Sequence, residues 1–321
     1  MKSSLKEFLN ELIDYAGLFP PTKLPLDKAV SNYAKYQGDS EAWMLGPFVI
    51  SIPNLHELDH YTSLFSKDDP LRVSVTGNRY RSEEEVLKGL NSTLNEIEAF
   101  RKKHRELVKV EALEIPLPPF PFSQELLEEI AEKTSANNLQ VFCEATQELE
   151  NQAWEEILMN TLDAIKVHNA GSQNLLLFKL RTGGVAQEMI PSPKQVAIAL
   201  AGCRDRVIPM KFTAGLHHPF RMYRTEVGAR MHGFVNVFTA GMFANVHQLD
   251  VERITEILCD MEPGNFSFNE TGITWKDLEI RKSDISKLRK NRFYSFGCCS
   301  FDVPRDDLRE LGILGEKEVY Q

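Results

Sequence analysis

Short hydrophobic runs alternate with longer amphipathic stretches along most of the chain. Eight runs have the length and composition of β-strands and cover residues 47–52, 71–76, 108–115, 139–145, 175–181, 207–213, 233–238 and 266–271. Helical patterns fall between and after them, at 54–66, 82–104, 123–136, 151–166, 192–203, 239–246, 248–261 and 283–291. Ser82, Ser123 and Ser192 are predicted as helix N-caps. Strands that alternate with helices in this way predict a parallel sheet covered by helices.

The spacing of the strands favours a closed barrel over an open sheet. Their centres lie about 31 residues apart, the repeat of an eight-fold β/α barrel of about 250 residues. A doubly wound open sheet is the alternative, and that fold normally carries a glycine-rich turn after its first strand. The sequence IPNLHE at this point has no such turn. We therefore predict an α/β protein with a single (β/α)8 TIM-type barrel.

The predicted barrel occupies most of the chain, so that residues 1–321 form one barrel domain. Residues 1–44 are expected to form a helical extension, residues 45–291 the barrel core and residues 292–321 a tail with a last strand or turn and a short helix. The loop at 14–22, rich in glycine, proline and aromatic residues, either lies across one end of the barrel or is a plain connection between helices.

Polar residues occupy one face of several predicted strands and come late in each strand. Lys179 and Arg181 share a face of strand 175–181, Lys211 and Thr213 share a face of strand 207–213, and Glu144 takes the matching place in strand 139–145. Because helices cover the outside of a barrel, the apolar faces should point outward and the polar faces inward. Barrel enzymes place their chemistry at the carboxyl ends of the strands. This set is therefore the predicted active site.

The two lysines suggest covalent chemistry. Lys179 and Lys211 lie at matching positions on neighbouring predicted strands, and two ammonium groups in one pocket repel, so we expect the pKa of one of them to fall. A deprotonated lysine is the nucleophile that forms a Schiff base with an aldehyde or ketone. The second lysine or Glu144 would then move protons, while Arg181 would hold a carboxylate or phosphate and Thr213 would contact the substrate. The alternative is a structural Lys–Glu–Lys network that closes a packed barrel.

Glycine-containing loops follow three of the predicted strands and supply candidate substrate-binding residues. Gly183 and Gly184 in KLRTGG, and Gly215 in KFTAG, would let backbone N–H groups approach a ligand. Residues 239–241 lie where a helix is expected to start, directly after the seventh strand with its Asn236, and the N-terminus of that helix could hold a phosphate. The candidates there are Asn236, Thr239 and Gly241. Glycine is equally common in tight turns that bind nothing.

Two adjacent histidines offer an alternative chemistry. With Glu144 and either Glu114 or Glu111, His217 and His218 provide enough nitrogen and oxygen ligands for a divalent metal. Strand 108–115 fits the alternating pattern least well, because Glu111 and Glu114 fall on opposite faces. No cofactor is predicted, apart from this divalent metal as the alternative.

The composition restricts the cellular compartment and the classes of binding partner that we expect. Lys and Arg number 37 against 46 Asp and Glu, a formal net charge of −9, which argues against a general nucleic-acid binder. The N-terminus has no apolar core of a signal peptide, and no apolar stretch approaches the ~20 residues of a membrane span. The odd number of cysteines, five, with no CxxC spacing fits free thiols in a reducing compartment. We therefore expect a cytoplasmic protein without nucleic-acid or membrane partners. The sequence does not decide between a monomer and a homo-oligomer.

Cys298 and Cys299 are adjacent in the sequence. A disulfide between neighbouring residues is strained, and the sequence associates no histidine or other base with these thiols. They therefore carry no prediction of a nucleophilic role.

Two resemblances follow from these motifs. The stretch MKFTAG around Lys211 resembles class I aldolases of the deoxyribose-phosphate type, in which the imine lysine lies late on the sixth barrel strand; those enzymes pair it with a lysine on the seventh strand, whereas the second lysine here is on the fifth. The stretches AGLFPP, KLRTGG, KFTAGLHHPFR, MHGFVNV and SFGCCSFDVPRDDLRELG together resemble a family of uncharacterised proteins of similar length. That likeness covers most of the chain and implies no activity.

The sequence as a whole predicts an enzyme that acts on a small anionic carbonyl compound. Lys211, Lys179 and Glu144 would carry out imine or proton-transfer chemistry of the aldolase or lyase kind. A metal-dependent hydrolase or isomerase on the same barrel is the first alternative. A barrel that binds a ligand without catalysis is the second.

Overall fold

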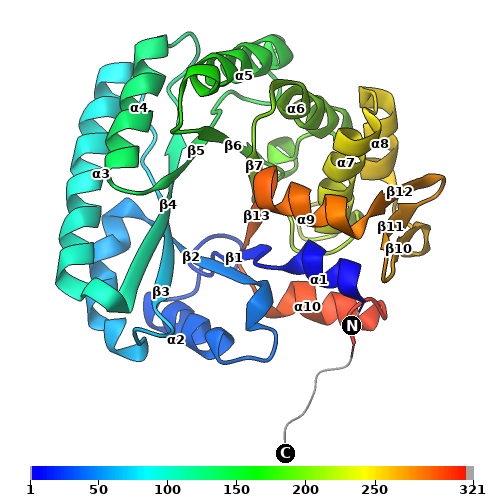
Figure 1. Ribbon diagram of the computed structural model, residues 1–321, viewed down its shortest axis with the longest axis horizontal. Coiled ribbons are helices and arrows are strands. Elements are labelled where there is room, and N and C mark those ends of the chain that lie inside the picture. The colour runs from blue at the N-terminus through cyan, green and yellow to red at the C-terminus, as the bar shows by residue number, and fades with distance from the viewer. Residues whose placement is uncertain (1, 316–321) are drawn as a thin grey trace, which may run out of the picture.

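Eight parallel strands close into a barrel in the computed structural model, which describes residues 2–315 (Figure 1). Around the barrel the strands follow in the order β1 (Ile13–Tyr15), β13 (Phe293–Cys298), β7 (Met210–Thr213), β6 (Leu176–Arg181), β5 (Gln140–Glu144), β4 (Val108–Pro116), β3 (Leu71–Thr76) and β2 (Leu45–Ser51). Each strand pairs in parallel with both neighbours, and β1 closes the ring between β13 and β2. The predicted TIM-type α/β fold is confirmed.

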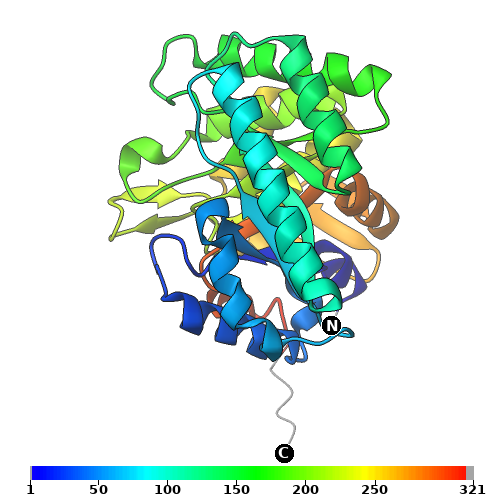
Figure 2. The same ribbon diagram turned by 90° about the vertical axis from the view of Figure 1, so that its left-hand side faces the viewer.

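Helices surround the strands, as Figures 1 and 2 show from two directions. They are α1 (Ser3–Leu9), α2 (Leu26–Gln37), α3 (Glu83–His104), α4 (Gln124–Ala136), α5 (Trp154–Gly171), α6 (Pro193–Arg206), α7 (Phe234–His247), α8 (Val251–Cys259), α9 (Lys282–Asn291) and α10 (Asp302–Glu310). Short 3₁₀ helices add η1 (Ala42–Met44), η2 (Ile52–His60), η3 (Thr62–Leu64), η4 (Arg105–Leu107), η5 (Gln187–Met189) and η6 (Pro263–Asn265). The three predicted serine caps accept backbone N–H bonds at the starts of α3, α4 and α6.

The ends of the chain complete the barrel, which corrects the predicted boundaries of 45–291 for its core. β1 lies within the segment expected to be a helix of the N-terminal extension, and β13 lies within the predicted tail. At three residues β1 is too short for period-two alternation to stand out, and its three residues are all buried. Only its pairing with β13 and β2 identifies it as a barrel strand.

Two predicted barrel strands lie elsewhere. Residues 233–238 belong to the start of α7, a helix buried nearly all round, whose continuous apolar run has no strand-specific period. Residues 266–271 contribute β10 (Phe266–Phe268) to a small antiparallel sheet with β11 (Gly272–Trp275) and β12 (Leu278–Arg281). A hairpin of β8 (Met222–Arg224) and β9 (Ala229–Met231) completes this long insertion between β7 and β13.

Alternation along the strands separates two apolar regions. Ala112, Phe142 and Leu177 form a small cluster with Tyr294 inside the barrel, apart from the large core that the outward faces share with the helices. In β4 the register with β3 shifts, so that Val73 faces Val110 and Ser74 faces Ala112, which leaves Glu111 as an extra residue. This bulge reverses the alternation and explains why Glu111 and Glu114 did not fit one pattern.

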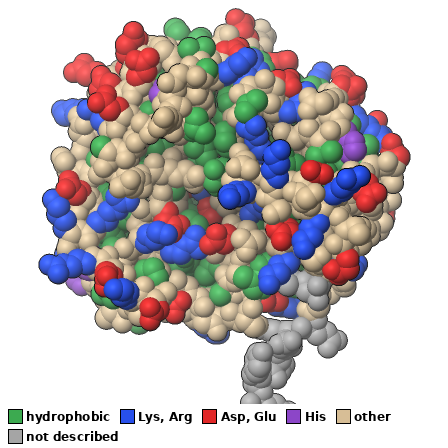
Figure 3. Space-filling view, viewed as in Figure 1, with side chains coloured by type: hydrophobic (Ala, Val, Ile, Leu, Met, Phe, Trp, Pro, Cys, Tyr) green, Lys and Arg blue, Asp and Glu red, His purple; other side chains and the backbone are tan. Residues whose placement is uncertain are grey.

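The surface carries charges of both signs. Figure 3 shows acidic and basic side chains interspersed over one face of the molecule, with apolar side chains between them. In Figure 2 the β8–β9 hairpin projects from one end of the barrel, and α1 and α9 lie towards the other. Across residues 2–315, every helix is too short or too polar to span a bilayer.

Candidate functional site

A network of buried ion pairs fills the centre of the barrel. Glu114 of β4 lies between the two lysines: its Oε1 is 2.6 Å from Lys211 Nζ and its Oε2 is 2.6 Å from Lys179 Nζ. Lys179 also reaches Glu144 Oε2 at 2.7 Å, and Lys211 reaches Asp14 Oδ2 at 2.6 Å. The order Asp14–Lys211–Glu114–Lys179–Glu144 therefore alternates in charge, and all five side chains are buried.

Parallel strand pairing produces this alignment. Lys179 is registered with Lys211 on one side and with Glu144 on the other. Side chains at matching register positions on one face stand next to each other. The structure therefore brings together Lys179, Lys211 and Glu144, as the sequence predicted.

Two serines complete the network. Ser74 Oγ donates to Glu114 Oε1 at 2.9 Å, and Ser295 Oγ donates to Asp14 Oδ2 at 2.8 Å. The other Asp14 oxygen, Oδ1, is buried and makes no hydrogen bond within the described residues. A Cβ at Gly46 would lie 2.2 Å from this oxygen, so only glycine leaves room for the carboxylate here.

The pKa values of the lysines rise, which contradicts the expected fall. Burial by itself lowers the pKa of Lys211, but the carboxylates of Asp14 and Glu114 outweigh burial and raise it well above its usual range. The pKa of Lys179 is raised in the same way by Glu114 and Glu144. Each ammonium group has two carboxylates in contact, so attraction exceeds the repulsion between the lysines.

The three carboxylates respond differently to the same environment. Burial raises the pKa of Glu114, but Lys179 and Lys211 outweigh it and hold the value below its usual range. For Glu144, Lys179 together with Arg181 and Arg79 outweighs burial and lowers the pKa in the same way. Asp14 has one lysine partner, and burial dominates, so its pKa is raised. Asp14 is therefore the carboxylate in the network that most readily takes a proton.

A cavity of about 300 Å³ opens over the network. It is lined from the centre by Glu114, Glu144, Lys179 and Lys211, and from its rim by the loops that follow the strands. This position at the carboxyl ends of the strands is where barrel enzymes bind their substrates. Phe19, Pro20 and Pro21 line the same cavity, so the loop after β1 lies at this end of the barrel, one of the two arrangements expected for it.

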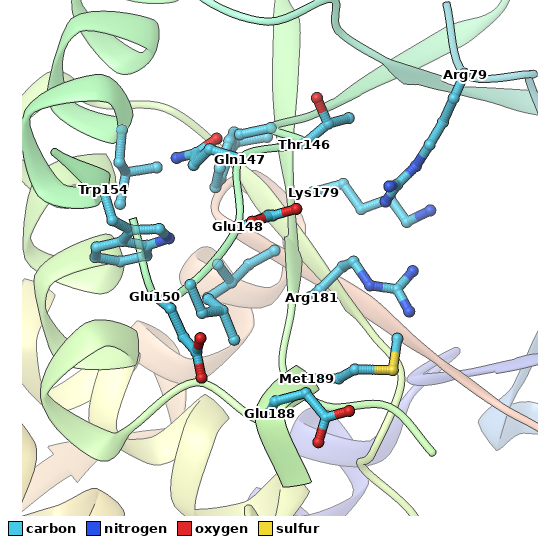
Figure 4. Close-up of a pocket in the computed structure, with 15 residues that line it drawn as sticks. Arg79, Thr146, Gln147, Glu148, Glu150, Trp154, Lys179, Arg181, Glu188 and Met189 are labelled. Carbon is cyan, nitrogen blue, oxygen red and sulfur yellow. The ribbon is translucent and has the colours of Figure 1, made fainter. Parts of the chain in front are cut away.

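Two arginines bring positive charge to the rim. Arg181 Nη1 lies 3.6 Å from Glu144 Oε1, and Arg79 Nη2 lies 3.5 Å from the same oxygen. Both guanidinium groups are partly exposed, and both line the cavity. A second hollow of about 410 Å³ adjoins it beside α5 and shares Arg79, Lys179 and Arg181. Figure 4 shows the charged ends of these three side chains on the same side of the hollow.

The loops after β6 and β7 meet at the mouth. Gly184, Gly215 and Thr213 line the cavity. Gly183 does not: a Cβ there would lie 2.9 Å from the Gly215 Cα, so this glycine allows the two loops to pass. Gly215 has a φ of +81°, which an L side chain rarely adopts.

The predicted phosphate site after the seventh strand is wrong, because its residues are buried in α7. Asn236 Nδ2 donates to the carbonyl oxygens of Ile257 and Asp260 at 2.9 and 2.8 Å. Thr239 Oγ1 donates to the Val235 carbonyl within the helix, at 2.6 Å. Gly241 packs against the Phe293 ring, where a Cβ would lie 2.5 Å from the ring. All three positions serve helix packing.

The predicted histidine metal site is wrong, because the two side chains have different partners. His217 lies against Cys298 and Cys299, whereas His218 Nδ1 contacts the carboxylate of Asp307. Within residues 2–315 no group of three or more His, Cys, Asp or Glu side chains is arranged to hold a metal ion.

Sequence reasoning missed several members of the site. Asp14 lies where the N-terminal helical extension was expected to pass into the loop at 14–22, with no strand predicted, and Glu114 was considered only as a metal ligand. Arg79 follows β3 and carries no motif. The signal that pointed towards Glu114 was its place near the end of a predicted strand, which the bulge at Glu111 obscured.

Comparison with known proteins assigns the chain to no family. The chain matches no family model and no curated protein. Among solved structures it is similar to "QR15, an Aldolase", with 15% identity, a TM-score of 0.43 and coverage of 66% of this chain and 83% of that one. It is also similar to a D-psicose 3-epimerase with D-tagatose from Clostridium cellulolyticum H10, with 10% identity, a TM-score of 0.43 and coverage of 79% and 92%.

Proposed function

We propose that the protein is an enzyme that forms an imine between Lys211 and a small anionic carbonyl compound. The observation that supports this most directly is the hydrogen-bonded pair of Lys211 and Asp14 beneath the cavity, 2.6 Å apart. An imine-forming lysine must first give up a proton, and Asp14 is placed to take it.

The partners of the two lysines assign them different roles. Lys179 lies between Glu114 and Glu144, whose pKa values are lowered, so neither carboxylate is a good proton acceptor. Lys211 contacts Asp14, whose pKa is raised and which has a free oxygen among the described residues. Asp14 is therefore a better proton acceptor for Lys211 than Glu114 or Glu144 is for Lys179. Lys211 is the nucleophile, and Lys179 stays charged.

The step balances without another reactant. Asp14 takes one proton from the Lys211 ammonium, and the freed amine attacks the carbonyl carbon to give a carbinolamine. The nitrogen then loses a second proton, and the two protons leave with the former carbonyl oxygen as water, so that an iminium ion remains. Lys179, as an ammonium group in the same cavity, stabilises negative charge that develops on the oxygen.

The rim of the cavity supports an anionic substrate. Within residues 2–315, Arg79 and Arg181 each form an ion pair with Glu144 alone, at 3.5 Å or more, and both remain partly exposed. A guanidinium group offers further N–H donors in a planar arrangement that suits a carboxylate or phosphate. A volume of about 300 Å³ is at the small end of ligand sites.

Trapping with borohydride tests the proposal. The protein is incubated with small aldehydes, keto acids and sugar phosphates, reduced with sodium borohydride, digested and mapped by mass spectrometry. We expect a reduced adduct on the peptide that contains Lys211. The corresponding peptide of a Lys211→Arg variant should carry no adduct, provided that this variant unfolds as cooperatively as the parent protein.

The competing outcomes are distinct. An adduct at Lys179 alone would reverse the assigned roles of the two lysines. No adduct at Lys211 or Lys179 with any compound would exclude the imine reaction for that panel and leave proton transfer by the same residues as the alternative.

A further inference from the structure

A second group of reactive side chains faces the same cavity. Cys299 directly follows β13, and its Sγ lies 3.6 Å from Nδ1 of His217, which follows β7. The Thr22 hydroxyl, from the loop before α2, donates to the same sulfur at 3.0 Å. Three segments far apart in the sequence therefore converge on one thiol.

The neighbouring thiol is placed differently. Cys298 Sγ lies 3.5 Å from the same His217 nitrogen, but Cys298 is the last residue of β13 and belongs to the hydrophobic core. Cys299 and His217 line the cavity, and Cys298 does not line it. Of these two thiols, Cys299, itself only 7% exposed, is the one that faces the cavity.

We propose that Cys299, with His217 as its proton partner, is a nucleophilic thiolate that takes small anionic electrophiles entering the cavity. A cysteine next to a histidine and a hydroxyl donor, at the edge of a cavity, has the surroundings in which thiolates form. The proton of Cys299 passes to His217, which leaves a thiolate beside an imidazolium ion. This site is separate from the lysine network and does not depend on an imine.

The electrostatics of the cluster agree with this assignment. A hydrogen bond from the Cys298 thiol, together with His217 and Thr22, outweighs burial and holds the pKa of Cys299 below its usual range. The pKa of Cys298 is raised, so the charge resides on Cys299. The other titratable groups that act on the pair are Tyr15 of β1 and Asp307 of α10.

The charge of the cavity sets the class of electrophile. Four cationic side chains line it, Lys179, Lys211, Arg79 and Arg181, against the two carboxylates of Glu114 and Glu144. Positive charge is therefore in excess and attracts an anion into the cavity. With an alkyl halide, the thiolate forms a C–S bond while the C–halogen bond breaks and halide leaves with the electron pair. With a carbonyl compound, the electron pair of the C=O bond moves to oxygen, which takes the proton from His217 to give a hemithioacetal.

Alkylation with iodoacetamide between pH 5 and pH 8 tests the thiolate. The exposed Cys259 is the internal reference for the reagent and the pH series. The thiolate fraction of a free cysteine in water rises on the order of several hundredfold over this range. We expect the rate at Cys299, followed by peptide mass spectrometry, to change by less than about tenfold. No modification of Cys299 at pH 5, or a rise as steep as at Cys259, would overturn the proposal.

Two variants identify the source of the reactivity. His217→Asn should lower the rate at Cys299 at pH 5 by about tenfold or more, because the imidazolium partner is lost. Cys259→Ser is the matched control and should leave the rate at Cys299 unchanged. An unchanged rate in His217→Asn would show that the histidine is not the proton partner and would contradict the pair.

A comparison of two reagents tests the preference for anions. Iodoacetate carries a negative charge that iodoacetamide lacks. The rate with iodoacetate is divided by the rate with iodoacetamide at Cys299 of the folded protein. The same ratio, measured at Cys299 of the chain unfolded in guanidinium chloride, is the reference. We expect a ratio about threefold or more higher in the folded protein, reduced in Arg181→Gln. An equal or lower ratio in the folded protein would contradict the assigned class. These measurements detect adducts on cysteine, whereas the borohydride experiment detects adducts on lysine. A negative result here would therefore contradict the thiolate without contradicting the imine at Lys211.

Discussion

At the scale of single residues, Glu114 is the link between the two lysines. Each of its oxygens contacts one ammonium group at 2.6 Å, and Ser74 adds a third donor. Glu114 is almost fully buried, so these partners replace the water that a carboxylate requires. Removal of its charge would leave two buried ammonium groups with fewer compensating charges.

We therefore predict that Glu114→Gln lowers the free energy of unfolding by about 3 kcal/mol at pH 7. The folded-state pKa of Glu114 is depressed, so its contribution is present above the unfolded pKa of about 4.3 and is lost as the pH falls towards the folded value. Urea unfolding at pH 7 and pH 3.5 should show a smaller difference between variant and parent at the lower pH. The exposed Glu128→Gln serves as the control, and an equal difference at both pH values would contradict the prediction.

At the scale of elements, α6 combines a favourable start with a strained end. Ser192 and Gln195 form a capping box, and Pro193 occupies the first turn. The C-cap is Val207, with φ of 62° and ψ of 29°, in the left-handed region that a β-branched residue rarely adopts. Its side chain is 59% exposed, so little packing compensates for this conformation.

Val207→Gly should therefore stabilise the protein by about 1 kcal/mol, because glycine adopts this conformation without the steric cost. In a protein of this size the expected rise in Tm is about 2 °C, measured by calorimetry. The same substitution at Val167, which is 63% exposed within α5, is the matched control and should destabilise the helix. If Val207→Gly lowers Tm as Val167→Gly does, the strain is not relieved by glycine.

At the scale of the whole molecule, the chain ends close the barrel. The short β1 lies between β2 and β13 and pairs with both. It also carries Asp14, so the same three residues complete both the ring of strands and the charge network. Stability and site therefore depend on the same long-range contacts.

A chain that lacks residues 2–24 should lose cooperative unfolding in urea, because β2 and β13 lose the strand between them and Lys211 loses one of its two carboxylate partners. The control is an insertion of Gly-Ser-Gly-Ser before Gly228, an exposed position in the β8–β9 turn with open space around it. We expect the insertion to preserve the unfolding midpoint within error. Cooperative unfolding of the shortened chain would show that β1 is dispensable.

Much of the fold follows from local pattern. The runs that became β2 to β7 are short and flanked by clear helical stretches, so periodicity located six barrel strands. The inward placement of Lys179, Lys211 and Glu144 followed from alternation alone. Most errors lie where alternation is absent: a three-residue strand, a bulge at Glu111, and the uniformly apolar start of α7. The run at 266–268 does alternate and is a strand, but it pairs in a separate antiparallel sheet, which local pattern does not reveal.

The sequence by itself determined the repeating β/α pattern, the helix caps and the strand face on which each of the two lysines lies, because these depend on residues close together in the chain. The tertiary structure decided how the barrel closes, that Asp14 meets Lys211 across 197 positions of sequence, and that His217 meets Cys299. It also reversed the expected pKa of the lysines. The physical reason is that a buried charge responds to whichever groups surround it, and only folding brings those groups together.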